Sequence, residues 1–276
     1  MPYRHAHWYL LALFPLIAVA FWPGYWGQLR SAPFALHAHG LTATAWLLLL
    51  TWQSWSIQTR KVAGHRIAGR ATFVVLPLFA AAGPPALQGM ARLWRTNADP
   101  FHAAFGSRLV IADMIAGPTV VLLVVYAVAH RREMERHAAA MLATALLVLP
   151  PIIGRLFPLT PGFPHGGWAG FGGFRLALQL AEGLTLLIAL SLARRSPAAR
   201  VGFGIAALAT AAQMIGFETI GRTAAWDQWI TLLTDLPSVP IAVAAAISAE
   251  LLLWWAWKRR PLARQFRRAT VTAGRM

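Results

Sequence analysis

Apolar stretches of membrane-spanning length follow one another along nearly the whole chain. A helix that crosses the roughly 30 Å of hydrocarbon in a bilayer needs about 20 mostly apolar residues. The pattern predicts an all-α, polytopic membrane helix bundle of about eight transmembrane helices, with seven as the alternative count. The predicted spans lie near residues 8–26, 37–57, 67–87, 105–129, 138–157, 173–193, 201–220 and 237–257.

The two end segments decide this count. The first segment is too long and too aromatic for a signal peptide, and no small-residue cleavage site follows it, so we expect a permanent helix. The last segment is the least secure, because residues 223–236 can form an interfacial helix that leads into it. Trp226 and Trp229 would then lie at the level of the lipid headgroups.

The connections between the spans alternate between basic and nearly uncharged. Arg and Lys concentrate near 60–70, 130–137 and 194–200 and after the last span, whereas the connections near 27–36, 88–104, 158–172 and 221–236 contain few. Basic connections stay in the cytoplasm. An even number of spans with both termini cytoplasmic therefore fits every connection.

Composition supports a membrane protein without a soluble domain. Hydrophobic residues make up 58% of the 276 residues and charged residues 12%, and the net charge is +16. In a soluble domain this charge would suggest nucleic acid, but here it lies on one face of a bilayer, so no nucleic-acid partner is predicted. The chain contains no Cys, which excludes disulfides and thiolate metal ligands.

We expect one transmembrane domain over residues 1–257 and a basic cytoplasmic tail over 258–276. The membrane lipid is the predicted partner. Anionic headgroups would gain about 1 kcal/mol for each Lys or Arg of the tail near the surface. The simpler alternative is that the tail only fixes the topology.

Ionisable side chains inside spans are costly, so they usually face a cavity or another helix and indicate function. Asp113, Arg155 and Glu182 all fall in the predicted outer half of the bundle, and we take them as candidate catalytic residues. Either Arg155 or Arg175 can neutralise one of the two carboxylates. The alternative is a network that only fixes packing. Glu218 and Arg222, four residues apart, are expected to pair with each other.

His37 and His39 open the second span and are candidate metal ligands. In a regular helix they would point about 200° apart, because each residue turns the chain by about 100°. They can share one ion only if residues 33–37 are not yet helical. The alternative role is capping or hydrogen bonding between helices.

His65 and His137 open the third and fifth spans at the predicted inner face. Two His at equal depth on different helices are what a bis-imidazole b-type haem requires. Arg66 or Arg70 would then meet the haem propionates. The alternative is that these side chains are interfacial cations, which is the preferred interpretation for His130.

A set of these residues resembles a group of largely uncharacterised bacterial multi-pass membrane proteins. The resemblance covers about residues 35–190 and implies a bacterial inner (cytoplasmic) membrane but no established activity; Glu182 stands where that group would have Asp. A weaker similarity to dihaem cytochrome b proteins lies in the His residues at span ends, although their spacing departs from that family. The motif consists of His37-Ala-His39-Gly40, Trp46, Gln53, His65-Arg66-x-x-Gly69, Asp113, His137, Met141, Thr144 and Arg155.

Three functional classes follow, and whether the protein is an enzyme is left open. A haem- or metal-linked membrane oxidoreductase or electron carrier ranks first because it accounts for both groups of His, with haem b or a divalent metal as cofactor. A proton- or cation-coupled transporter or channel accounts for the carboxylates alone. A zinc hydrolase using His37 and His39 is disfavoured because no His-x-x-x-His or His-Glu-x-x-His occurs. A structural subunit of a complex, with unidentified protein partners, is the remaining alternative.

Overall fold

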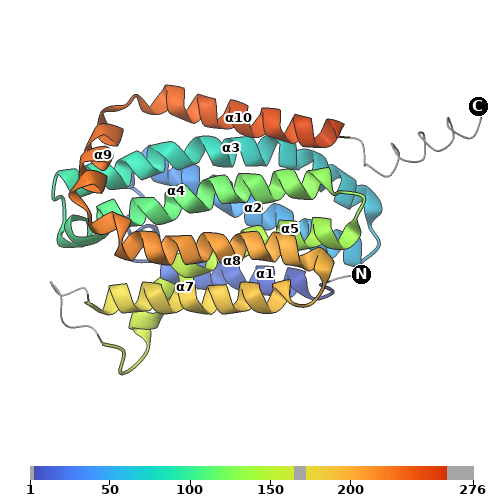
Figure 1. The fold of residues 1–276 in the computed structure, drawn as a ribbon, viewed down its shortest axis with the longest axis horizontal. Helices are drawn as coiled ribbons and strands as arrows, with labels where there is room; N and C mark the ends of the chain where they lie inside the picture. Colours follow the sequence, from blue (N-terminus) through green and yellow to red (C-terminus); the bar gives the residue numbers. More distant parts are fainter. Residues whose placement is uncertain (1–2, 165–171, 260–276) are drawn as a thin grey trace, which may run out of the picture.

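The computed structural model describes residues 3–164 and 172–259, and within them every regular element is a helix. The antiparallel helices form an elongated bundle (Figure 1), and seven helical segments are long and apolar enough to cross a membrane. The predicted polytopic helical bundle is therefore confirmed. The seven segments are α2 (Phe34–Gln58), α3 (Val62–Arg95), α4 (Pro100–Ala129), the α5–α6 segment (Met134–Leu159), α7 (Gly172–Ala193), α8 (Pro197–Glu218) and α10 (Ser238–Lys258).

The first predicted span is shorter than expected. Helix α1 covers Ala6–Ala20, 15 residues, and the chain then turns before Pro23 and Gly24. At about 1.5 Å per residue this helix is only about 22 Å long, less than the hydrocarbon thickness. The count of seven thus describes the full-length spans, and α1 is an additional, shorter apolar helix.

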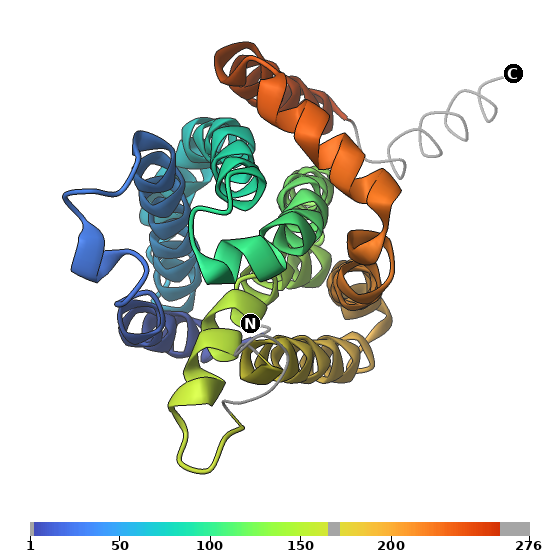
Figure 2. The ribbon, with the colours of Figure 1, turned by 90° about the vertical axis from the view of Figure 1, so that its left-hand side faces the viewer.

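The basic connections gather at one end of the bundle, which we call the basic end. Residues 59–61, 130–133 and 194–196 lie there, on the right of Figure 1, together with the last turn of α10. The opposite end, called the far end, carries the other connections and is turned toward the viewer in Figure 2. The predicted alternation of charge therefore matches the fold. The basic tail beyond Arg259 lies outside the described residues.

The far end is closed by helix α9 (Ala224–Asp235), in the segment predicted as an interfacial helix. Trp226 and Trp229 stack on each other with ring centres 5.1 Å apart. Contacts with α9 also extend α3 beyond its predicted end at residue 87. Gln88 donates to two carbonyl groups at the end of α9, and Arg95 pairs with Asp235 at 2.6 Å.

Helix α4 begins earlier than predicted because Asp99 caps it. The Asp99 carboxylate accepts a hydrogen bond from the backbone N–H of His102 at 2.9 Å, and Pro100 occupies the first helical position. This bond, together with the His102 ring, holds the pKa of Asp99 below its usual value. His102, which the spacing would assign to a loop, therefore belongs to the first turn of α4.

The fifth predicted span is broken into two helices. Helix α5 covers Met134–Leu146 and α6 covers Leu149–Leu156. Pro150 and Pro151 lack the N–H groups that would continue the helix. The Arg155 guanidinium donates to the Pro151 carbonyl oxygen at 2.8 Å, which satisfies one backbone group near the break.

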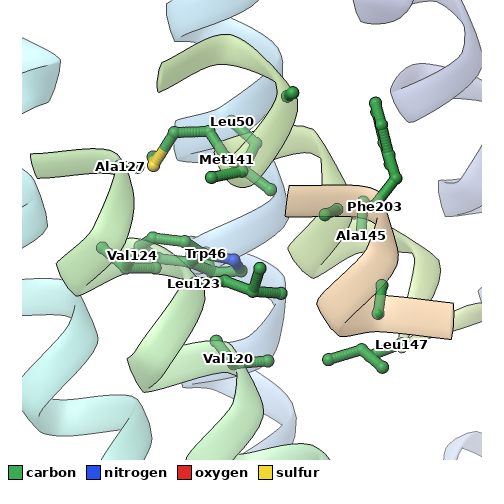
Figure 3. Close-up of a cluster of buried hydrophobic side chains, with 14 of the residues drawn as sticks. Trp46, Leu50, Val120, Leu123, Val124, Ala127, Met141, Ala145, Leu147 and Phe203 are labelled. Carbon is green, nitrogen blue, oxygen red and sulfur yellow. The ribbon is translucent and has the colours of Figure 1, made fainter. Parts of the chain in front are cut away.

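The main hydrophobic core lies between α2, α4, α5 and α8 (Figure 3). Trp46 fills its centre and is 2% exposed. Gly202 of α8 lies directly on the backbone of α5 at Ala139 and Ala140. Small residues at a helix contact let two backbones approach closely, as is typical of membrane bundles.

Candidate functional site

The two His residues predicted at the inner face do come together. His65 lies in the first turn of α3 and His137 in the first turn of α5, both at the basic end and both partly buried. Their ring centres are 6.4 Å apart and their ring planes are nearly perpendicular, at 85°. Two helices far apart in the sequence thus place two imidazoles side by side.

Hydrogen bonds to the backbone orient both rings. His137 Nδ1 lies 2.9 Å from the carbonyl oxygen of Ala127, and His65 Nδ1 lies 3.4 Å from that of Gln53. Because a carbonyl oxygen only accepts, each Nδ1 is the donor of its bond, and Nε2 is the nitrogen left to bind another group. Metal-binding histidines are commonly oriented in this way.

The number of protein ligands limits which group this pair could hold. Within residues 3–164 and 172–259, no group of three or more His, Cys, Asp or Glu residues could hold a metal ion. A six-coordinate haem needs only two protein ligands. Arg66 and Arg70, exposed on the same end of α3, supply positive charge for propionates.

His130 lies at the same end of the bundle but makes different contacts. Its Nδ1 lies 2.9 Å from the carbonyl oxygen of Tyr126, one turn earlier in α4, and its ring packs on the Tyr126 ring at 4.1 Å. It therefore satisfies a carbonyl group at the end of its own helix.

His37 and His39 do not point to a common ion. Helix α2 begins at Phe34, so both residues are already helical and the condition for their convergence is not met. His37 Nδ1 forms a hydrogen bond with the Tyr25 hydroxyl at 2.8 Å, whereas the His39 ring packs on Phe79 at 5.8 Å. A joint metal site at these two residues gains no support from this geometry.

Asp113 lies near charged groups of two other helices. The ionisable side chains of His39 on α2 and Arg155 on α6 are its neighbours. Asp113 lies near the middle of α4, and its side chain is exposed although α4 packs mainly on α3, α5 and α8. The Arg155 guanidinium also stacks on the Phe21 ring at 4.6 Å.

Glu182 forms a second, separate group. Its side chain is 1% exposed, and neither carboxyl oxygen has a hydrogen-bond partner among the described residues. Arg175 does not neutralise it, because its guanidinium makes two hydrogen bonds of 2.7 and 2.6 Å to Glu218. The expected pairing of Glu218 with Arg222 is thus secondary, at 3.9 Å. Arg175 from the neighbouring helix reaches the carboxylate in the better two-bond geometry.

Sequence reasoning missed Glu250 and Tyr25. Glu250 lies in α10, and its Oε2 is buried without a partner in the described part of the chain. The signal was present, because a single carboxylate in the Ala- and Leu-rich segment 237–257 meets the criterion that selected Glu182. The pairing of Tyr25 with His37 had no signal, because it joins the α1–α2 connection to the first turn of α2.

Comparison with protein-family models, with curated proteins and with solved structures found no significant match. The resemblance to bacterial multi-pass membrane proteins therefore stays a prediction from the motif. Function has to be inferred from the side chains that this fold brings together, in a chain that is a multi-pass helical membrane protein.

Proposed function

We propose that this protein is an electron carrier of a bacterial inner membrane that binds a b-type haem between His65 and His137. The observation that carries the proposal is the pair of imidazoles 6.4 Å apart, each with its Nδ1 bonded to a backbone carbonyl group. A haem with two His ligands supplies reversible one-electron exchange. The basic end, where the pair lies, is the cytoplasmic side by the positive-inside rule.

The chain's own residues would hold and orient the group. The carbonyl groups of Gln53 and Ala127 fix the protonated nitrogen of each ring, so the opposite nitrogen is available as a ligand. These carbonyl groups belong to α2 and α4, while the rings belong to α3 and α5. Four helices thus fix the orientation of the two ligands. Arg66 and Arg70 favour anionic groups at the same end.

Absorption spectra of the detergent-purified, haem-supplemented protein test the proposal. We expect a Soret band and, after reduction with dithionite, sharp α and β bands. His65→Ala and His137→Ala should each abolish the reduced bands, because each removes one of the two His residues that would hold the haem. His130→Ala is the matched control, since His130 has the same Nδ1 bond to a carbonyl group at the same end. Spectra without haem bands, or bands that survive both substitutions, would reject the proposal.

A second candidate function is proton- or cation-coupled transport. This function is favoured by the carboxyl group of Asp113, which lies near the middle of α4 and is exposed. Its ionisable neighbours, His39 and Arg155, belong to two other helices. Ion or proton uptake by liposomes containing the wild-type protein should then be lost in Asp113→Asn, which removes the titratable group without changing its size. Asp99→Asn, at the far end of the same helix, is the control and should retain uptake. Equal uptake by wild type and Asp113→Asn would eliminate this function.

A further inference from the structure

An open pocket lies at the far end of the bundle, beside the first turns of α7. Its volume is about 420 Å³, and Arg175, Gln179 and Glu218 are its polar lining residues. The ion pair between Arg175 and Glu218 joins α7 to α8 at this pocket. The Nε2 atom of Gln179 is buried and has no hydrogen-bond partner in residues 3–164 and 172–259. The pocket thus ends at an amide whose donor group is unused.

Glu182 follows Gln179 on the same face of α7. Residues three and four apart are neighbours on a helix, so Arg175, Gln179 and Glu182 form a continuous polar line about 10 Å long. The residue one turn before Glu182 belongs to an apolar cluster. Leu178, one turn before it, packs with Phe105 of α4 and Phe217 of α8, and Gly154 of α6 contacts Leu178. The polar line therefore leads from the pocket into the apolar interior of the bundle.

An ionised carboxylate at this position would be very unfavourable. Burying a charge without a partner costs far more than burying a neutral polar group. Helix α7 packs on α5, α6 and α8, and its Phe174 contacts Phe105 of α4. The charged group of α8 that faces the Glu182 carboxyl group is Glu218, which is itself an acid. No cation within the described residues offsets the charge at hydrogen-bond distance.

We infer that Glu182 is a proton-binding site, protonated at rest, that exchanges its proton with the aqueous phase at the far end through the pocket lined by Arg175, Gln179 and Glu218. The site is independent of the haem proposal, because its residues lie on α7 and α8, whereas His65 and His137 lie on α3 and α5. Gln179 is the last polar group before Glu182, so it is the connecting residue. The ligand class is the proton itself, bound to a carboxyl oxygen.

Infrared difference spectroscopy of the full chain in lipid tests this inference. The spectrum of wild type minus Glu182→Gln should contain the C=O stretch of a protonated carboxylic acid at neutral pH. Transfer to D₂O should shift this band within minutes, because the pocket connects the acid to water. In Gln179→Leu the band should remain, but its shift in D₂O should be several-fold slower. Glu250→Gln, which removes another buried carboxyl group, should leave the band intact.

The outcomes test separately whether Glu182 is protonated and whether water reaches it through the pocket. If the band is absent from the difference spectrum, Glu182 is ionised and the inference fails. If the band is present but exchanges equally fast in Gln179→Leu, proton binding holds and the route through the pocket is wrong. Thermal unfolding shows whether the Glu182→Gln variant folds normally. The variant should keep the wild-type Tm, because it replaces a neutral acid by a neutral amide of the same size. A large loss of stability in this variant would also contradict a neutral acid.

Discussion

Replacing Trp46 with alanine is expected to destabilise the protein by about 3 kcal/mol. The Trp46 side chain is 2% exposed, and it packs against Leu123, Val124 and Met141 from two other helices (Figure 3). Its Nε1–H also donates to the Thr144 hydroxyl at 3.1 Å. The substitution would therefore leave a large cavity and remove a hydrogen bond between α2 and α5.

The expected loss lies at the lower end of the range for aromatic-to-alanine changes in soluble cores. In lipid or detergent the separated helices keep their side chains in apolar surroundings, so little hydrophobic transfer energy is lost. The remaining cost comes from lost packing contacts and from the cavity.

Unfolding of the purified protein by a denaturing detergent, followed by circular dichroism and tryptophan fluorescence, would measure this effect. Trp52→Ala is the matched control, because Trp52 lies on the same helix but is 51% exposed. The control should change stability by less than about 1 kcal/mol, as surface substitutions usually do. Equal losses in the two variants would show that Trp46 is not a core residue.

The second large effect is expected at Gly202, where adding a single methyl group should cost about 2 kcal/mol. A Cβ atom there would lie 2.8 Å from the backbone nitrogen of Ala140 and 2.9 Å from its Cα. These are backbone atoms of α5, so no side-chain rotation can relieve the overlap. Helix α8 would have to move away from α5, and the neighbouring Phe203 would lose core contacts.

Gly204→Ala is the control for this prediction, because nothing lies within 4 Å of a Cβ atom at that position. Alanine favours a helix over glycine by roughly 0.5–1 kcal/mol, so Gly204→Ala should be neutral or slightly stabilising. The same unfolding experiment should therefore show a loss of stability for Gly202→Ala and no loss, or a small gain, for Gly204→Ala. If Gly202→Ala is also stabilising, the close contact of α5 with α8 does not exist in the membrane.

The two proposed sites lie in different parts of the bundle. The His65 and His137 pair is at the basic end, whereas the pocket lies beside the first turns of α7 and Glu182 lies near the middle of that helix. One protein can therefore combine the two proposed activities, electron transfer at the His pair and proton binding at Glu182. The spectra and the infrared experiment test the two sites separately.

The sequence alone determined the helical membrane architecture, because its signals are local. About 20 apolar residues in a row must cross the bilayer as a helix, and basic connections fix which end faces the cytoplasm. For the same reason the helix at 224–235 and the break before Pro150 could be anticipated. The lone carboxylates and the terminal His residues could also be identified as unusual, since each is costly where it stands.

Only the tertiary structure decided which of these residues meet. The pairing of His65 with His137, of Arg175 with Glu218, and the isolation of Glu182 depend on how helices distant in sequence rotate and pack. The early end of α1 and the extension of α3 to Arg95 likewise arise from a turn and from contacts with α9. Hydropathy specifies how far a helix runs through lipid, but the rotation of each helix about its axis is set by packing against its neighbours.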